Sequence, residues 1–141
     1  KTKKKSRKIK KKKLRKKRMH PEAGMHPFLL QKRRENIMKY QVQENCLTIF
    51  LPREVDHHHA EEIRKNADMV IEKNHIKYVI FDFERTEFMD SSGIGAIMGR
   101  YRLIRLVDGE VWAVHTSMRI KKILTLSGVT RIMQIYEEEQ R

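Results

Sequence analysis

The chain has 141 residues, which is enough for one ordinary domain and too few for two independent cores. Its net charge of +14 is divided unevenly: residues 1–37 hold 17 Lys/Arg against two Glu, whereas residues 38–141 have a net charge of −1. The near-neutral part therefore does not predict a nucleic-acid or anionic-membrane surface. A single cysteine excludes an internal disulfide, and the absence of any apolar run near ~20 residues argues against a membrane span, so we expect a cytoplasmic protein.

Residues 1–37 are rich in lysine and too polar to bury a core. We expect a disordered basic N-terminal extension, followed by one folded domain over residues 38–141. The run KRRENIM, residues 32–38, can be back-translated into a purine-rich ribosome-binding element just before a Met codon, which is typical of an over-extended gene start. The alternative, from a different functional class, is a nucleic-acid-binding arm, which predicts steeply salt-dependent binding that vanishes when residues 1–37 are removed.

The first regular segment, KYQVQENCLTIFLP, predicts a hairpin of two short strands with its turn at Glu44-Asn45. Pro52 ends the second strand or lies at its edge, because proline has no N–H for a strand ladder. Cys46 lies within this strand, and we expect a buried structural thiol rather than a reactive one. The candidates for the inward face are Val42, Leu47, Ile49 and Leu51.

A first helix is predicted from Asp56 or His57 to about Asn74, because aspartate is a favourable cap. The apolar face of this helix has the expected spacing, with Ala60, Ile63, Ala67, Val70 and Ile71. The run YVIFDF, residues 78–83, is typical of a buried central strand.

A second helix is predicted to begin at Asp90 or Ser91, and a third at Thr116 or Ser117 with Gly128 at its end. Between them, Asp108-Gly109 predicts a turn into the strand EVWAV, whose Trp112 belongs to the core or its edge. RIMQIY supplies a last short strand, and residues 137–140 a polar end. The core face of the second helix is Ile94, Ile97, Met98, Tyr101 and Ile104, and that of the third is Ile120, Ile123 and Leu124.

The resulting order is β-β-α-β-α-β-α-β. Alternation after the hairpin favours an α/β fold with a mixed, partly parallel β-sheet and helices packed against it.

The stretch FMDSSGIGAIMGRYR, residues 88–102, places two serines and three glycines at the start of the second helix. A serine hydrolase elbow requires glycine two residues before the nucleophile, and neither serine has one. A dinucleotide-binding loop requires a third glycine where Met98 stands. Five histidines follow residue 56, and nothing selects one of them as a base. Hydrolase and nucleotide-binding functions are therefore disfavoured.

The same stretch remains suitable as a substrate for another protein. Glycines without side-chain bulk let a partner approach the backbone, and we expect Gly95 and Gly99 to allow close packing of helix and sheet. A phosphate on a serine here would bring a charge of roughly −1.5 to −2 at pH 7. The helix N-terminus would tolerate that charge, whereas a partner docked beside Asp90 would not.

FMDSSGIGAIMGRYR resembles the signature of the STAS domain of bacterial anti-sigma factor antagonists. EVDHHHAEEIRKNAD, residues 54–68, is similar to the Asp-His-His element of the sporulation branch, the anti-sigma-F factor antagonists. The similarity extends from about Met38 to Tyr136. The resemblance implies a STAS-like single domain that is not an enzyme. His59 departs from the family pattern, where a small polar residue is expected.

By this resemblance, the unphosphorylated protein would bind an anti-sigma factor that is also a serine kinase, and would thereby release the sporulation sigma factor. The kinase would use its own ATP to phosphorylate Ser91 and switch the protein off, and a phosphoserine phosphatase would reverse this. No cofactor and no direct nucleic-acid partner of the folded domain are implied, and a monomer or weak dimer is expected. The general-stress antagonists, which share the mechanism, are the nearest alternative. The residues implied at the partner surface are Asp56, Asp90, Ser91, Ser92, Gly93, Ile94 and Gly95.

The run His57–His59 is a poor candidate for a metal site, because consecutive helical residues point in different directions. We interpret it as an exposed first helical turn at or near the partner surface.

Overall fold

The computed structural model describes residues 24, 26–30 and 36–136. The expected disordered extension falls mostly outside these residues, and the expected polar end at 137–140 lies entirely outside them. Residues 35–141 form one unit, and this unit contains all of the strands described.

The sheet is mixed, as expected, with five strands in the order β1-β2-β4-β6-β7. Strand β1 is antiparallel to β2, and the other neighbouring strands are parallel. The bounds are Lys39–Gln43 for β1, Cys46–Phe50 for β2, Tyr78–Asp82 for β4, Glu110–Val114 for β6 and Gln134–Ile135 for β7.

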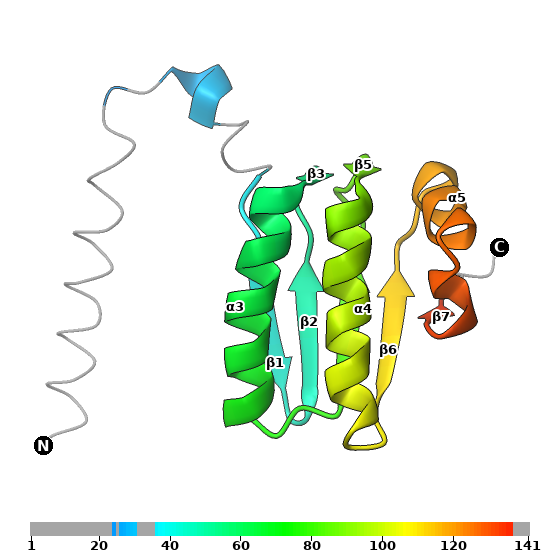
Figure 1. Ribbon diagram of the computed structural model, residues 1–141. Helices are drawn as coiled ribbons and strands as arrows, with labels where there is room; N and C mark the ends of the chain where they lie inside the picture. Colours follow the sequence, from blue (N-terminus) through cyan, green and yellow to red (C-terminus); the bar gives the residue numbers. More distant parts are fainter. Residues whose placement is uncertain (1–23, 25, 31–35, 137–141) are drawn as a thin grey trace, which may run out of the picture. The chain divides into compact units, whose positions relative to one another are not determined.

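Helices α3 (His57–Lys73) and α4 (Ser91–Arg105) lie side by side across one face of this sheet, followed along the chain by α5 (Met118–Leu126) (Figure 1). The predicted caps are confirmed, because the side chains of Asp56, Asp90 and Ser117 accept hydrogen bonds from the first turns of the three helices. Gly128 follows α5 with a left-handed φ of 80°, which is the conformation expected of a glycine that ends a helix.

The core forms between this helical layer and the alternating residues of the three central strands. Leu47, Val79 and Val111 are in register with one another across β2, β4 and β6, and all three are at most 2% exposed. Ile63 of α3 and Ile97 of α4 pack into the same cluster. Because side chains alternate along a strand, the intervening residues point to the opposite face of the sheet.

Two expectations about single residues are wrong, because each of them depends on which part of the sheet the helices cover. Val42 is 41% exposed, since β1 is the edge strand. Cys46 is half-buried and not buried, because it lies on the face opposite Leu47. Trp112 lies at the edge of the core, one of the two places expected for it, and its Nε1 donates to Glu110 Oε2 at 3.0 Å.

Two strands were not predicted from the sequence. Strands β3 (Glu54–Val55) and β5 (Phe88–Met89) pair in parallel as a separate two-stranded sheet. The expected last strand is also shorter than RIMQIY, because Arg131 belongs to the 3₁₀ helix η1 (Val129–Arg131). Two residues are too few to show the alternation by which a strand is recognised in a sequence.

Candidate functional site

The two-stranded sheet brings the starts of α3 and α4 together. Val55 is in register with Met89, so the next residues in the two segments, Asp56 and Asp90, begin their helices side by side. A hydrogen bond of 3.2 Å from Asp90 N to Val55 O links the two turns directly. Two segments more than thirty residues apart thus form one surface, which presents two helix N-termini with their positive dipole ends.

Asp90 holds the turn in which the paired serines lie. Its Oδ1 accepts hydrogen bonds from Ser92 N at 2.9 Å and from Gly93 N at 3.2 Å. These two bonds satisfy backbone donors that a helix start otherwise leaves unpaired. Ser91 is the first helical residue and is exposed, whereas Ser92 is half-buried. Of the two serines, Ser91 is therefore the more accessible to a partner.

Asp56 plays the same capping part at the start of α3, where its Oδ1 accepts from His59 N at 3.0 Å. This backbone hydrogen bond is the main reason that the pKa of Asp56 lies below its ordinary value. The histidine run is exposed only in part, contrary to expectation. His57 and His58 are exposed, but His59 is 8% exposed, with its Nε2 3.1 Å from Asn36 O.

The glycines of α4 differ from the expectation. Gly93 is buried beneath the turn, and a β-carbon there would lie 2.4 Å from Met89 Cγ and 3.0 Å from Val55 Cγ1. It is therefore Gly93 that permits close packing, and its place is under the surface rather than on it. Gly95 and Gly99 would meet no heavy atom within 4 Å, because they face a groove and not the sheet. Ile94 is half-buried and packs against the core.

The groove at Gly95 and Gly99 runs between α3 and α4 and has a volume of about 290 Å³. Small residues on α4 leave this space open, and polar side chains from both helices border it. It begins at the paired helix starts and continues toward Arg100. The polar and charged lining residues are His57, Glu61, Arg64, Ser92 and Arg100.

Arg100 is a charged residue inside the helical layer, with only 5% of its surface exposed. Its Nε lies 2.8 Å from Asp68 Oδ1 on α3, which makes an ion pair without the alignment of a hydrogen bond. Burial is the main reason that the pKa of Arg100 is lowered, and Asp68 opposes this shift. Nη1 of Arg100 is buried with no hydrogen-bond partner among the described residues. The periodicity of α4 did not reveal this residue, because arginine is rarely buried.

A second hollow, of about 400 Å³, lies on the sheet face opposite the helices. Its lining is almost entirely apolar, and it explains why Cys46 and Trp112 are only half-buried. The residues that line it are Cys46, Tyr78, Ile80, Trp112, Val114 and Tyr136.

A third feature lies at the carboxyl ends of β4 and β6. Asp82, Glu84 and His115 form the one group of three potential metal ligands found within the described part of the chain, and it does not include the run His57–His59. Sequence reasoning missed this group. The available signal was Asp-x-Glu at the end of one predicted strand and a histidine directly after the next.

None of the helices that the structure describes combines the length and the apolar character required to cross a bilayer.

The chain belongs to the STAS domain family, which it matches over residues 38–141. Among curated proteins, it is 34% identical over 93 residues to the anti-sigma F factor antagonist of Paenibacillus polymyxa, covering 66% of this chain and 80% of that one. It is 33% identical over 99 residues to the protein of the same name from Lysinibacillus sphaericus, covering 70% and 85%. The anti-sigma-B factor antagonist of Listeria monocytogenes is 25% identical over 93 residues, covering 66% and 81%.

Two solved structures carry the same fold. The unphosphorylated anti-sigma factor antagonist SpoIIAA superposes with a TM-score of 0.65 at 33% identity, covering 73% of this chain and 90% of that one. The phosphorylated form of the Bacillus cell fate determinant SpoIIAA gives a TM-score of 0.60 at 33% identity, covering 73% and 94%. The expected fold class, a STAS-like α/β domain, is thereby confirmed.

Proposed function

We propose that this protein is an anti-sigma factor antagonist whose binding surface is the paired start of α3 and α4. The observation that carries the proposal is the exposed Ser91, held by the Asp90 cap beside the Asp56 cap. The names of its relatives support the antagonist role, and the higher identity to the anti-sigma F branch than to the anti-sigma-B branch favours the sporulation system. The partner is then an anti-sigma factor, and its binding releases the sigma factor.

In the proposed switch, the anti-sigma factor is a serine kinase that phosphorylates Ser91. The Oγ of Ser91 loses its proton and bonds to the γ-phosphorus of ATP, while the bond between the β- and γ-phosphates breaks and ADP leaves. A relative whose structure has been solved in a phosphorylated form supports this reading. The chain itself supplies an accessible hydroxyl and a rigid turn, and the partner supplies the catalysis.

The electrostatic consequence follows from the position of Ser91. A phosphate at a helix N-terminus lies at the positive end of the helix dipole, so the fold tolerates it. The same charge of roughly −2 lies next to the Asp90 carboxylate on the outer surface. A partner surface that fits the neutral hydroxyl then meets an added negative charge, and it dissociates without any refolding of the antagonist. A phosphoserine phosphatase would restore the binding form.

The residues proposed for the partner surface are Asp56, Asp90, Ser91, Ser92 and Gly95. The groove supports this assignment, because Ser92 and Gly95 border it at the end where the two helices begin. Gly93 and Ile94 act from beneath, by fixing the turn against Met89 and the core.

The proposal is tested by the affinity of three variants for the anti-sigma factor of the same organism, measured by isothermal titration calorimetry. Ser91→Ala should bind as the unmodified protein does and should not accept phosphate, whereas Ser91→Asp should bind at least tenfold more weakly. Ser117→Asp is the matched control, because it places the same charge at the exposed start of α5. Equal affinities of Ser91→Ala and Ser91→Asp would refute the switch.

A further inference from the structure

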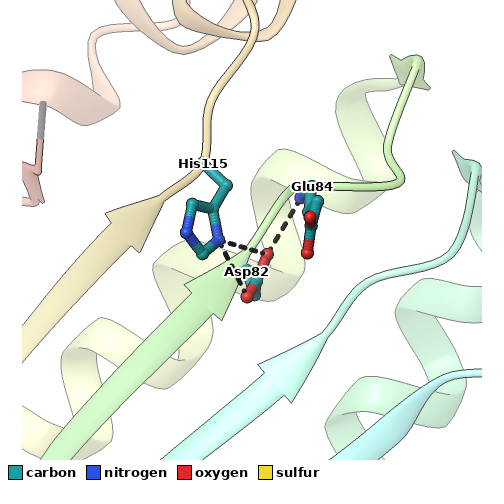
Figure 2. A group of neighbouring side chains, drawn as sticks. All are labelled: Asp82, Glu84 and His115. Atoms are coloured by element: carbon teal, nitrogen blue, oxygen red, sulfur yellow. Dashed lines mark hydrogen bonds and ion pairs between the residues drawn. The ribbon is translucent and has the colours of Figure 1, made fainter. Parts of the chain in front are cut away.

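Asp82, Glu84 and His115 meet where two adjacent parallel strands end. Asp82 is the last residue of β4, Glu84 follows it by two positions, and His115 is the first residue after β6. Figure 2 shows the three side chains turned toward one another. The carboxyl ends of parallel strands are the usual place for ligands in α/β sheets.

The donor atoms of this group are close enough to share one ion. His115 Nδ1 is 3.1 Å from each carboxylate oxygen of Asp82, and one donor atom of each residue lies within 4.8 Å of the other two. Ligand atoms bound to one transition-metal ion at ~2.0–2.2 Å lie up to roughly 4 Å apart. Glu84 is exposed, so its side chain has room to rotate toward the other two ligands.

Asp82 is the fixed member of the group. It is 5% exposed, and its Oδ1 accepts a hydrogen bond of 2.9 Å from Glu84 N. The loop that carries Glu84 is therefore anchored on the carboxylate beside which Glu84 lies.

The charges of the group are unbalanced. Two carboxylates converge, and the ion pair that the described residues provide for them is the one between Asp82 and His115. A divalent cation would offset both carboxylates at once.

We propose that Asp82, Glu84 and His115 form a binding site for a divalent transition-metal ion of the zinc class. The mixture of one imidazole nitrogen with two carboxylate oxygens suits zinc, cobalt or manganese better than magnesium or calcium, which prefer oxygen alone. On binding, the Nδ1 lone pair of His115 replaces its hydrogen bond to Asp82, and the ring proton resides on Nε2. Three protein ligands leave a coordination position for water. The site shares no residue with the Ser91 turn and does not depend on the proposed function.

The proposal is tested with the full chain by calorimetric titration with Zn²⁺, Mn²⁺ and Mg²⁺, and by the visible absorption of bound Co²⁺. One saturable Zn²⁺ site that binds at least tenfold more tightly than Mg²⁺ is expected, together with a Co²⁺ spectrum. His115→Gln and Glu84→Gln should each weaken Zn²⁺ at least tenfold. They are preferred to Asp82 variants because both positions are exposed, and thermal unfolding of each variant verifies that it folds.

His75→Gln is the matched control. His75 is also exposed and also has a left-handed backbone, with φ of 50° against 55° for His115, so the two substitutions disturb the backbone alike. Retained Zn²⁺ affinity and Co²⁺ absorption in His75→Gln, with loss of both in His115→Gln, would support the site. Absence of saturable Zn²⁺ binding, or equal binding by the two variants, would overturn it.

Discussion

Asp56 is a side chain that both caps a helix and lies on the proposed binding surface. Its carboxylate begins α3, and the pairing of Val55 with Met89 places it next to the turn of Ser91. The sequence predicted the cap, because aspartate before an apolar helical repeat is a local signal. It did not predict that Asp56 and Asp90 are neighbours except through the family resemblance, because that contact depends on two strands of two residues each.

The cap at Asp56 predicts a dependence of stability on pH. The folded pKa of Asp56 is lowered from 3.8, chiefly by the hydrogen bond from His59 N, so the carboxylate stabilises the fold above that value and loses this effect as the pH falls through the folded pKa. Asp56→Ala should cost about 1 kcal/mol at pH 7. Urea unfolding should show that the difference from the unmodified chain shrinks below about pH 4.

Asp56→Ser is the control for this measurement, because serine caps a helix without titrating. At pH 7, Asp56→Ser should lose less free energy of unfolding, relative to the unmodified chain, than Asp56→Ala does. A pH-independent cost of Asp56→Ala would contradict the assignment of the cap to the ionised carboxylate.

Helix α4 has the helical repeat and the cap that the sequence predicts, but its glycines have packing roles that the sequence did not predict. The 3.6-residue repeat and the Asp90 cap define the helix from sequence. The packing role of each glycine depends on which elements its backbone approaches, and this information is not local. Gly93 faces Met89 and Val55 from the unpredicted small sheet, whereas Gly95 and Gly99 face the groove.

Alanine substitutions at the glycines of α4 should therefore change the stability of the protein in opposite directions. Gly93→Ala should destabilise the protein by about 1–3 kcal/mol, because the new methyl group overlaps the buried Met89. Gly95→Ala and Gly99→Ala should each stabilise it by about 0.5–1 kcal/mol, because alanine favours the helix and its methyl group meets open space. The midpoints of urea unfolding measure all three changes. Undiminished stability of Gly93→Ala would show that the turn packs less tightly against Met89 and Val55 than the structure indicates.

The contact between α3 and α4 includes the buried charge of Arg100, whose burial the sequence pattern did not predict. Arg100 follows the groove-facing Gly99 in sequence. The helical periodicity of α4 does not by itself distinguish an inward arginine at this position from an exposed one. The decisive partner is Asp68, which lies on another helix.

Removal of Asp68 should be costly, because Arg100 would remain buried without its counter-ion. We expect Asp68→Ala to lose about 3 kcal/mol, the lower end for a broken buried pair, since Asp68 is partly exposed. The double variant Asp68→Ala/Arg100→Met should recover most of the loss, because no uncompensated charge remains. Chemical unfolding of the single and double variants measures this coupling. Additive losses would mean that the ion pair contributes little.

At the scale of the whole molecule, composition and periodicity predicted the α/β class, the mixed sheet and the three helices with their caps. They did not decide which sheet face the helices cover. The sequence pattern of β2 is compatible with a second covered face, which is why it wrongly predicts a buried Cys46. The helices α3 and α4 cover only the face of Leu47, Val79 and Val111, and the apolar hollow remains on the other.

The charge of the molecule is also divided by region. The net charge of +15 on residues 1–37 is compatible with a nucleic-acid-binding arm, but the paired helix starts that carry the proposed function lie in the near-neutral remainder. The proposed role as an antagonist therefore predicts that removal of residues 1–35 leaves the affinity for the anti-sigma factor unchanged. That variant retains Asn36 and Ile37, whose carbonyl oxygens contact His59 and Arg85.

In the proposed switch, Ser91 is the residue on which the partner acts. The most direct measurement is incubation of the full chain with the cognate anti-sigma factor and ATP, followed by mapping of the phosphate by tandem mass spectrometry. We expect one phosphate, on Ser91 and not on the half-buried Ser92, and loss of binding in the modified fraction. Phosphate on another residue, or undiminished binding after modification of Ser91, would contradict it.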